Sequence, residues 1–448
     1  MARRLRQTSA AGILSLCCAL AVPAVAHAAG FQLNEMSAAS LGNAHAGMAA
    51  SDDLSTIFFN PAGLSLSSGR LFTASAFAIR PSAEFENRGS VSALGTPLTG
   101  GNGGDAGKWA PVPALYYATD LGYPGLRLGL GLQVPFGLST EYESGWVGRY
   151  QALKSSLMTV NISPVVSYQV NERLALGAGV SAQYVDVELT RAIDFGAACA
   201  ATAGAAACAG AGLRPQASDG LATVKGKDWA FGFNLGAVFT PAAGSRVGVA
   251  YRSKISHSLT GDARFDKPAG LPGPLAASPS FTNTGARAGI DLPESVSVSG
   301  QVELDARWTL LADATWTHWS RFNELRVRFD NGAPDNVTAE EWRNTVRLSL
   351  AANYRLNERW KLRGGVAWDP SPVRTEFRTP RIPDNDRTWL AFGVQYRLSP
   401  NASWDVGYAH LFVKDAAIDK REPPLGGRLT GEYSSSVNIL SVQYNHAF

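Results

Sequence analysis

The sequence predicts an all-β fold, a transmembrane antiparallel β-barrel of about fourteen strands with a small N-terminal plug, or hatch, inside the lumen. Three observations support this prediction. The chain begins with an export signal and has no later helical anchor. It contains few charged residues. Its segments of alternating apolar and polar residues are joined by connections that are alternately short and long.

Residues 1–28 form a predicted secretory signal peptide. A basic stretch that ends at Arg6 precedes the apolar run AAGILSLCCALAVPAVA, and Ala26-His27-Ala28 is a cleavage site of the A-x-A type. The mature chain is expected to begin near Ala29 or Gly30.

The composition after this signal narrows the class of protein. Charged residues make up 17% of the chain, below the roughly 25% of soluble domains, and there are 46 glycines and 11 tryptophans. No later apolar run reaches the roughly 18 residues of a membrane-spanning helix. This profile is typical of a transmembrane β-barrel, with a secreted all-β adhesin as the alternative. A net charge of +3 gives no argument for a nucleic-acid partner.

Connection lengths favour the barrel, because outer-membrane barrels have short turns at one end and long loops at the other. Six short connections alternate with seven long ones, which makes an even number of strands, about fourteen. The first strand is expected to begin near Leu71, so residues 70–448 form the predicted barrel. The short connections are residues 119–125, 170–173, 240–245, 304–307, 356–359 and 398–402, and the long ones lie near residues 81–107, 138–154, 193–222, 263–285, 330–340, 370–386 and 415–431.

Alternation within the strands assigns their two faces. In residues 174–184, apolar side chains alternate with small or polar ones, and the apolar set must face lipid because lipid cannot solvate a charge. Arg347 and Arg363 fall on the inward set. An aromatic belt is expected where tryptophans lie near strand ends on the outward set, at Trp308, Trp316, Trp368 and Trp404.

The C-terminal strand ends in Phe448, with Tyr444, Val442 and Leu440 in step. This end resembles the terminal signal that the barrel-assembly machinery of Gram-negative bacteria recognises. The resemblance implies the cell outer membrane as the location and that machinery as a partner during biogenesis.

One predicted strand contains a proline. Residues 126–137 read LRLGLGLQVPFG, with leucines, valine and phenylalanine on one face and arginine, glycines and glutamine on the other. Pro135 cannot donate to a ladder, and Gly137 permits a bend. Val134, Pro135, Phe136 and Gly137 are therefore a candidate opening in the wall, or an ordinary bulge near a strand end.

The segment before the first strand, residues 29–69, is expected to be the hatch. It lacks sustained alternation, and Ile57, Phe58, Phe59 and Leu64 are too apolar for a free periplasmic tail. A barrel of this width leaves a lumen that such a segment can fill.

Two cysteines remain after signal cleavage, Cys199 and Cys208. In an oxidising compartment a close pair of this kind is most simply a structural disulfide. Two sulfurs without a nearby histidine make a poor zinc site.

Several motifs resemble the FadL family of outer-membrane fatty-acid transporters. They are AGFQLNE at the mature start, Asn60-Pro61-Ala62, YRSK at 251–254, LPESVSVSG at 292–300, WTHWSRFNEL at 316–325, DPSPV at 369–373 and IPDNDRTWL at 382–390. The resemblance runs nearly end to end. It implies a monomeric barrel of fourteen strands with an N-terminal hatch and no cofactor.

The resemblance also implies how cargo is released. In the family an inward kink of strand three opens a hole beside the Asn-Pro-Ala motif of the hatch, and residues 134–137 occupy the matching place. Asn60 is one candidate for satisfying the backbone groups that the kink leaves unpaired. Release into lipid is downhill for an amphiphile, which gains about 0.8 kcal/mol per buried CH₂.

Capture of the ligand is likewise implied by the family. Phe31 and Leu33 would line an inner pocket, and Arg191 would hold a carboxylate by charge-assisted hydrogen bonds. Apolar loops at 193–222 and 263–285 would form an outer groove. A second basic residue of the family has no clear counterpart here, since Thr338 falls nearest, and Arg343 is the candidate substitute.

The expected function is passive uptake of long-chain fatty acids or similar hydrophobic molecules. Neutral aromatic hydrocarbons are the alternative substrate, and a general porin is the alternative architecture. No histidine lies in an evident catalytic constellation and the HExxH motif is absent, so an enzyme is not expected.

Overall fold

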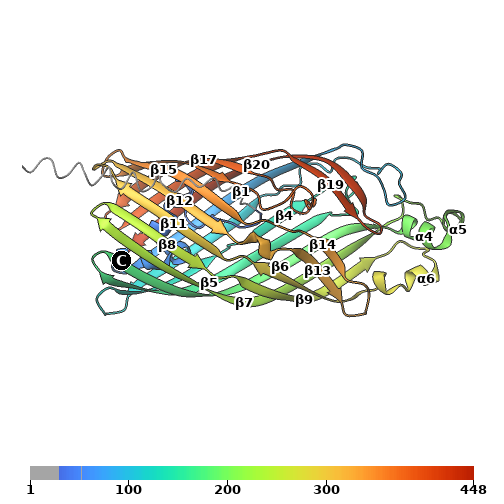
Figure 1. Cartoon of the computed structure of the whole chain (residues 1–448), viewed down its shortest axis with the longest axis horizontal. Coiled ribbons are helices and arrows are strands. Elements are labelled where there is room, and N and C mark those ends of the chain that lie inside the picture. Colours follow the sequence, from blue (N-terminus) through green and yellow to red (C-terminus); the bar gives the residue numbers. More distant parts are fainter. Residues whose placement is uncertain (1–29, 52) are drawn as a thin grey trace, which may run out of the picture.

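The strands form one antiparallel sheet that closes on itself. The computed structural model describes residues 30–51 and 53–448, so the predicted signal peptide lies outside the described residues. β1 (Leu71–Asn87) pairs with β2 (Ala110–Asp120) on one side and with β20 (Gly427–Ala447) on the other, which closes the barrel in Figure 1. Among the described residues, no helix is long and apolar enough to cross a membrane.

The predicted strand number is confirmed, since the barrel has 14 strands. Some of them are divided into two segments by short interruptions. The divided strands are β3 (Leu126–Gln133) with β4 (Gly137–Glu141), β8 (Ser245–Arg252) with β9 (Ile255–Asp266), β10 (Thr284–Leu292) with β11 (Ser295–Glu303), β12 (Trp308–Thr317) with β13 (Glu324–Phe329), β14 (Asn336–Ala339) with β15 (Thr345–Arg355), and β18 (Ala402–Val413) with β19 (Ala416–Glu422). The undivided ones are β1, β2, β5 (Lys154–Asn171), β6 (Leu174–Asp194), β7 (Asp219–Ala242), β16 (Trp360–Asp369), β17 (Arg387–Ser399) and β20.

The two ends of the barrel differ as predicted. The six short connections join neighbouring strands at one end, and two of the connections at the other end carry short helices (Figure 1). These helices are α4 (Phe195–Ala203), α5 (Ala205–Gly210), α6 (Gly273–Ala276) and the 3-10 helix η3 (Pro279–Phe281), while η4 (Trp319–Arg321) joins β12 to β13.

The expected long loop at residues 415–431 is wrong in extent. β19 and β20 extend the barrel wall as a paired hairpin and are joined by residues 423–426 alone. Ile418 and Leu429 are buried, whereas outward positions such as Asp419 carry polar side chains. The strand was missed because its outward positions carry polar side chains, so the outward apolar set that marks a spanning strand is absent there.

The predicted faces are confirmed by burial. Leu176, Val180 and Phe392 are exposed on the outside of the barrel, whereas Arg347 and Arg363 are buried inside. Trp308, Trp368 and Trp404 are exposed as an aromatic belt requires, and Trp316 is partly exposed.

The hatch (residues 30–51 and 53–69) packs against the inner face of the barrel wall, as the plug prediction requires. Its apolar residues Leu41, Ile57 and Leu64 are fully buried. Its elements contact strands on opposite sides of the barrel, so the segment crosses the lumen. They are α2 (Ala38–Leu41), η1 (Met48–Ala50), α3 (Thr56–Phe59) and η2 (Pro61–Leu66).

Glycines on the inner wall form the socket that receives the hatch. A Cβ atom on Gly236 would lie 1.7 Å from Oδ1 of Asn60, and one on Gly177 would lie 2.3 Å from the backbone nitrogen of Ala62. A Cβ atom on Gly365 would lie 2.4 Å from the backbone of Asn43. The hatch therefore fits the wall only because these positions carry no side chain.

Candidate functional site

Strand three is interrupted between β3 and β4. The β3–β5 ladder stops at the pair Gln133 and Asn161 and resumes, as β4–β5, at Gly137 and Met158. On the other side, the ladder between β2 and β3 extends no further than Leu115 and Leu132. Residues 110–114 of β2 thus pair with β1 but have no described ladder partner towards strand three.

The unpaired part of β2 contains Pro111 and Pro113, which have no backbone N–H. A central strand rarely tolerates proline, but an edge does, because no ladder bond is lost there. The sequence of β2 therefore suits a local edge in the middle of a closed barrel.

The first residues of the hatch pair with the interruption. The Leu33 N–H donates to the Pro135 carbonyl at 2.9 Å, and the Gly137 N–H donates to the Phe31 carbonyl at 3.0 Å. Phe136 is in turn held to β5, where its N–H donates to Oγ1 of Thr159 at 3.0 Å. The expectation that Asn60 satisfies the freed backbone is wrong, because Phe31 and Leu33 do so.

Asn60 instead holds the hatch to β7, three strands along the wall from strand three. Its side-chain amide donates to the carbonyls of Ala49 at 2.6 Å and Ala237 at 3.1 Å, and its Oδ1 accepts from the Ala62 N–H at 3.1 Å. Pro61 begins η2, where its missing N–H costs nothing. The Asn-Pro-Ala motif thus fixes the hatch on β7.

The interruption also reverses a predicted face. The sequence alternation put Val134 and Phe136 on the same face as Leu128 and Leu130, which are exposed outside the barrel. Val134 and Phe136 are buried. The parity fails because the chain leaves the sheet plane after Gln133, and both side chains turn towards apolar partners in the lumen.

Phe31 anchors the N-terminal segment in an aromatic cluster. Its ring lies 5.2 Å from Trp319, 5.6 Å from Trp342, 5.9 Å from Phe136 and 6.0 Å from Phe322, between ring centroids. Tilted and edge-on aromatic pairs of this kind add to the free energy of apolar burial. The segment that pairs with the interruption is therefore held by side chains as well as by backbone.

A cavity of about 570 Å³ connects this region to the outside of the barrel. Much of its lining is apolar and includes Leu33, Ile79, Val112, Val134, Leu411 and Ile439. The lining also includes Pro113 and Met158, which face outward on β2 and β5. The cavity thus passes through the wall at the interruption.

Charged groups meet at the inner end of the cavity. Arg387 donates to Asp384 at 2.7 Å and to the Gly30 carbonyl at 3.2 Å, while the Gly30 N–H donates to Asp384 at 2.9 Å. Glu35, Arg347 and Asp369 line the same cavity. Sequence reasoning noted the inward direction of Arg347 but not its place in the cavity, because β15 meets the hatch only in the folded barrel.

Arg191 lies elsewhere. Its guanidinium is 3.5 Å from Glu422 on β19, a strand that is not adjacent to β6, so the side chain points into the lumen as its parity predicts. It is absent from the cavity lining. Burial, with a smaller contribution from the positive charge of Arg191, lowers the pKa of Arg381 in the nearby loop to about 10.

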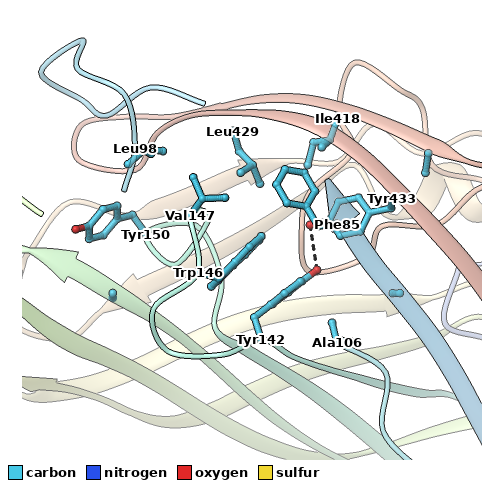
Figure 2. Packing of buried hydrophobic residues seen from close by; sticks show 13 residues of the cluster. Phe85, Leu98, Ala106, Tyr142, Trp146, Val147, Tyr150, Ile418, Leu429 and Tyr433 are labelled. Carbon is cyan, nitrogen blue, oxygen red and sulfur yellow. Dashed lines mark hydrogen bonds between the residues drawn. The ribbon is translucent and has the colours of Figure 1, made fainter. Parts of the chain in front are cut away.

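Aromatic residues close the extracellular mouth of the barrel. Tyr142 and Trp146, in the connection after β4, stack with ring centroids 3.9 Å apart, and the Tyr142 hydroxyl lies 3.1 Å from that of Tyr433 (Figure 2). Phe85 packs on Trp146 at 5.7 Å. Arg149 pins the same connection by donating to Asp219 at 2.7 Å.

Cys199 and Cys208 are joined by a disulfide in the loop between β6 and β7. The bond links α4 to α5, and an apolar cluster beneath them includes Phe195, Leu213 and Leu275. The predicted apolar loops at 193–222 and 263–285 therefore pack against each other.

Comparison with known proteins identifies the family. A sequence profile described as "Outer membrane protein transport protein (OMPP1/FadL/TodX)" matches residues 19–448. The chain belongs to this family.

Relatives within the FadL family cover almost the whole chain. A protein of Neisseria meningitidis serogroup B, whose name places it in the outer membrane, is 33% identical over 94% of this chain and 95% of its own. The long-chain fatty acid transport protein of Escherichia coli K12 is 28% identical with the same coverage. The crystal structure of a Pseudomonas aeruginosa FadL homologue is 27% identical and covers 94% of this chain and all of the other, with a TM-score of 0.86.

Membership of the FadL family establishes the coarse function and location. The protein is a transporter of hydrophobic compounds in the outer membrane of a Gram-negative bacterium and not an enzyme. Its substrate and the route of release require separate arguments.

Proposed function

We propose that this protein takes up long-chain fatty acids or similar hydrophobic molecules and releases them sideways into the membrane through the interruption of strand three. The observation that carries this proposal is the cavity itself. Its lining runs from Leu33 in the hatch to Pro113 and Met158 on the outer face of the barrel. Its volume of about 570 Å³ is within the range of roughly 300–1,000 Å³ that is usual for small-molecule sites.

A second cavity argues against release through the hatch. It has about 360 Å³ and is lined by polar groups that include Asp53, Arg363, Asp405 and Asn445, next to the periplasmic turn at residues 399–402. An alkyl chain would lose apolar surroundings on entering it. Sideways release instead gains about 0.8 kcal/mol for each CH₂ that enters lipid.

In this proposal the predicted site residues have separate roles. Phe31 and Leu33 contact the cargo and close the opening, residues 134–137 form the gate, and Asn60, Pro61 and Ala62 keep the hatch seated. The name of the Escherichia coli relative supports a fatty acid as the substrate.

Neutral hydrocarbons are a second candidate substrate class, and the position of Arg191 favours them. This residue is paired with Glu422 and lies outside the cavity lining, so it is not available there as a carboxylate partner. A neutral substrate needs no such partner. If Arg191 holds the acid, Arg191→Ala will weaken uptake of a fatty acid while uptake of toluene remains unchanged.

The gate is tested by rebuilding strand three. The double variant Pro135→Thr with Gly137→Thr supplies a donor and strand-forming residues at the interruption. We expect uptake of radiolabelled palmitate by cells to collapse, while palmitate binding at the cell surface and the amount of folded protein stay normal.

The matched control is Pro164→Thr in β5, opposite Leu130, where the ladder between β3 and β5 is continuous. Its uptake should equal that of the wild type. Normal uptake by the rebuilt variant would show that cargo passes through the hatch and would refute sideways release.

A further inference from the structure

Arg347 occupies an unusual place in the barrel interior. It lies on β15, its side chain is 3% exposed, and it lines the inner end of the cavity. The apolar side chains Leu33, Leu411 and Ile439 share that lining. A guanidinium beside an apolar ligand space is costly unless a partner neutralises it.

Two other arginines of the barrel interior have a carboxylate partner. Arg363 pairs with Asp405 at 2.7 Å and Arg387 pairs with Asp384 at 2.7 Å. Within residues 30–51 and 53–448, no carboxylate lies within 4.0 Å of the Arg347 guanidinium, and its buried Nε has no hydrogen-bond partner. Arg347 therefore keeps one buried donor without a partner, and the residue itself lines the cavity.

The same guanidinium holds a turn of the hatch. Its Nη2 donates to the Ala44 carbonyl at 2.6 Å. Ala44 and His45 have φ angles of 47° and 57°, consecutive left-handed conformations that residues with a Cβ atom rarely adopt. Such a conformation persists only when its surroundings hold it in place, and the Arg347 bond is one such restraint.

We propose that Arg347 is the carboxylate receptor of the inner cavity and that a carboxylate bound there loosens the hatch turn at Ala44. A ligand carboxylate can accept from Nε and from Nη2 as a bidentate partner. The Ala44 carbonyl then competes with the ligand for Nη2, so occupancy of the cavity weakens the restraint on the turn. This inference rests on the proposed uptake of fatty acids and assigns the charged group that uptake requires.

Three acidic groups, Glu35, Asp313 and Asp369, lie near Arg347, and Glu35 and Asp369 also line the cavity. Asp369 accepts from Nε1 of Trp389 at 3.2 Å, which occupies part of its carboxylate. Glu35 lines the same end of the cavity and is buried. A carboxylate ligand at Arg347 would be repelled by an ionised Glu35, whereas a neutral ligand would not.

Binding of laurate and of 1-dodecanol to the purified protein in nanodiscs separates charge recognition from apolar recognition. For Arg347→Met we expect the Kd of laurate to rise about 10- to 100-fold, with the Kd of 1-dodecanol changed less than twofold. Arg347→Lys should recover part of the affinity, because lysine keeps the positive charge. The recovery should be incomplete, because lysine lacks the two parallel N–H donors of the guanidinium. Glu35→Gln should tighten laurate binding and leave 1-dodecanol binding unchanged.

The hatch is followed in the same samples by hydrogen exchange of residues 40–50. Laurate should speed exchange of this segment in the wild type, and 1-dodecanol should not. In Arg347→Met the exchange should be fast without ligand and insensitive to laurate. Arg359→Met, an exposed arginine in a short turn, is the matched control and should behave as the wild type.

The outcomes distinguish this inference from the proposed function. Equal loss of laurate and 1-dodecanol binding in Arg347→Met, or no loss of either, would overturn the role of Arg347 and leave hydrophobic uptake standing. Laurate binding that Glu35→Gln does not improve would place the carboxylate elsewhere. Failure of the wild type to bind either ligand would refute the proposed function itself.

Discussion

The N–H of Leu33 donates a hydrogen bond of 2.9 Å to the carbonyl of Pro135. The N-terminal part of the hatch thus supplies pairing that the neighbouring barrel strand does not supply at the interruption. A closed barrel must satisfy its backbone groups because lipid offers no donors or acceptors. Anything that displaces Phe31 and Leu33 would therefore leave the Gly137 N–H and the Pro135 carbonyl without these partners and favour an open wall.

Truncation of Phe31 should release this segment. Phe31→Ala removes a buried ring from the cluster with Trp319 and Trp342, a change that typically costs about 3–5 kcal/mol. We expect faster hydrogen exchange at the amides of Leu33 and Gly137, measured by mass spectrometry on the folded protein.

The same substitution on the lipid face provides the comparison. Phe231 is 75% exposed on the outside of β7, so Phe231→Ala should leave exchange at Leu33 unchanged. If both variants exchange alike, Phe31 does not anchor the segment.

Two adjacent glycines on β16 offer a matched test of the socket. A Cβ atom on Gly365 would clash with the backbone of Asn43, whereas one on Gly364 would meet nothing within 4 Å. Gly365→Ala should dislodge the hatch and raise the ion conductance of the protein in planar bilayers. Gly364→Ala should conduct as little as the wild type, and equal conductance of the two variants would mean that the socket does not hold the hatch.

The barrel itself could be predicted from the sequence because each spanning strand repeats one physical requirement. Lipid selects apolar side chains at alternate positions, and Leu176 and Val180 show that selection clearly. The exposed positions of β19 carry polar side chains, so alternation of apolar residues does not mark this strand, and the sequence predicted a loop there.

The candidate site was harder to predict because its contacts join distant parts of the chain. Pro135 pointed to an interruption, but no local signal indicated that Phe31 and Leu33 would fill it. The family motif drew attention to Asn60, which the fold places against β7 instead. Arg191 could be assigned a direction from parity, but its partner Glu422 comes from a strand far away in sequence.

The disulfide should stabilise the extracellular helices and not the barrel. Cys199 and Cys208 are 9 residues apart. Closing a loop of this size lowers the conformational entropy of the unfolded loop, which stabilises the folded loop by about 2.5 kcal/mol in the chain-entropy treatment. In Cys199→Ser with Cys208→Ser, limited proteolysis should cut residues 195–215 faster. The unfolding temperature of the barrel should remain that of the wild type, and a large decrease would show that the loop supports the barrel.

Trp146 should control access from outside, because its ring stacks on Tyr142 within the mouth of the barrel (Figure 2). Trp146→Ala removes a fully buried ring and the hydrogen bond from its Nε1 to the Ala152 carbonyl. Loss of a buried aromatic ring typically destabilises the packed structure by about 3–5 kcal/mol, so the connection after β4 should open more readily. We expect laurate to associate faster in stopped-flow measurements. Trp109→Ala, at a tryptophan that is 67% exposed, should leave the rate unchanged. An unchanged rate in Trp146→Ala would mean that ligands enter by another path.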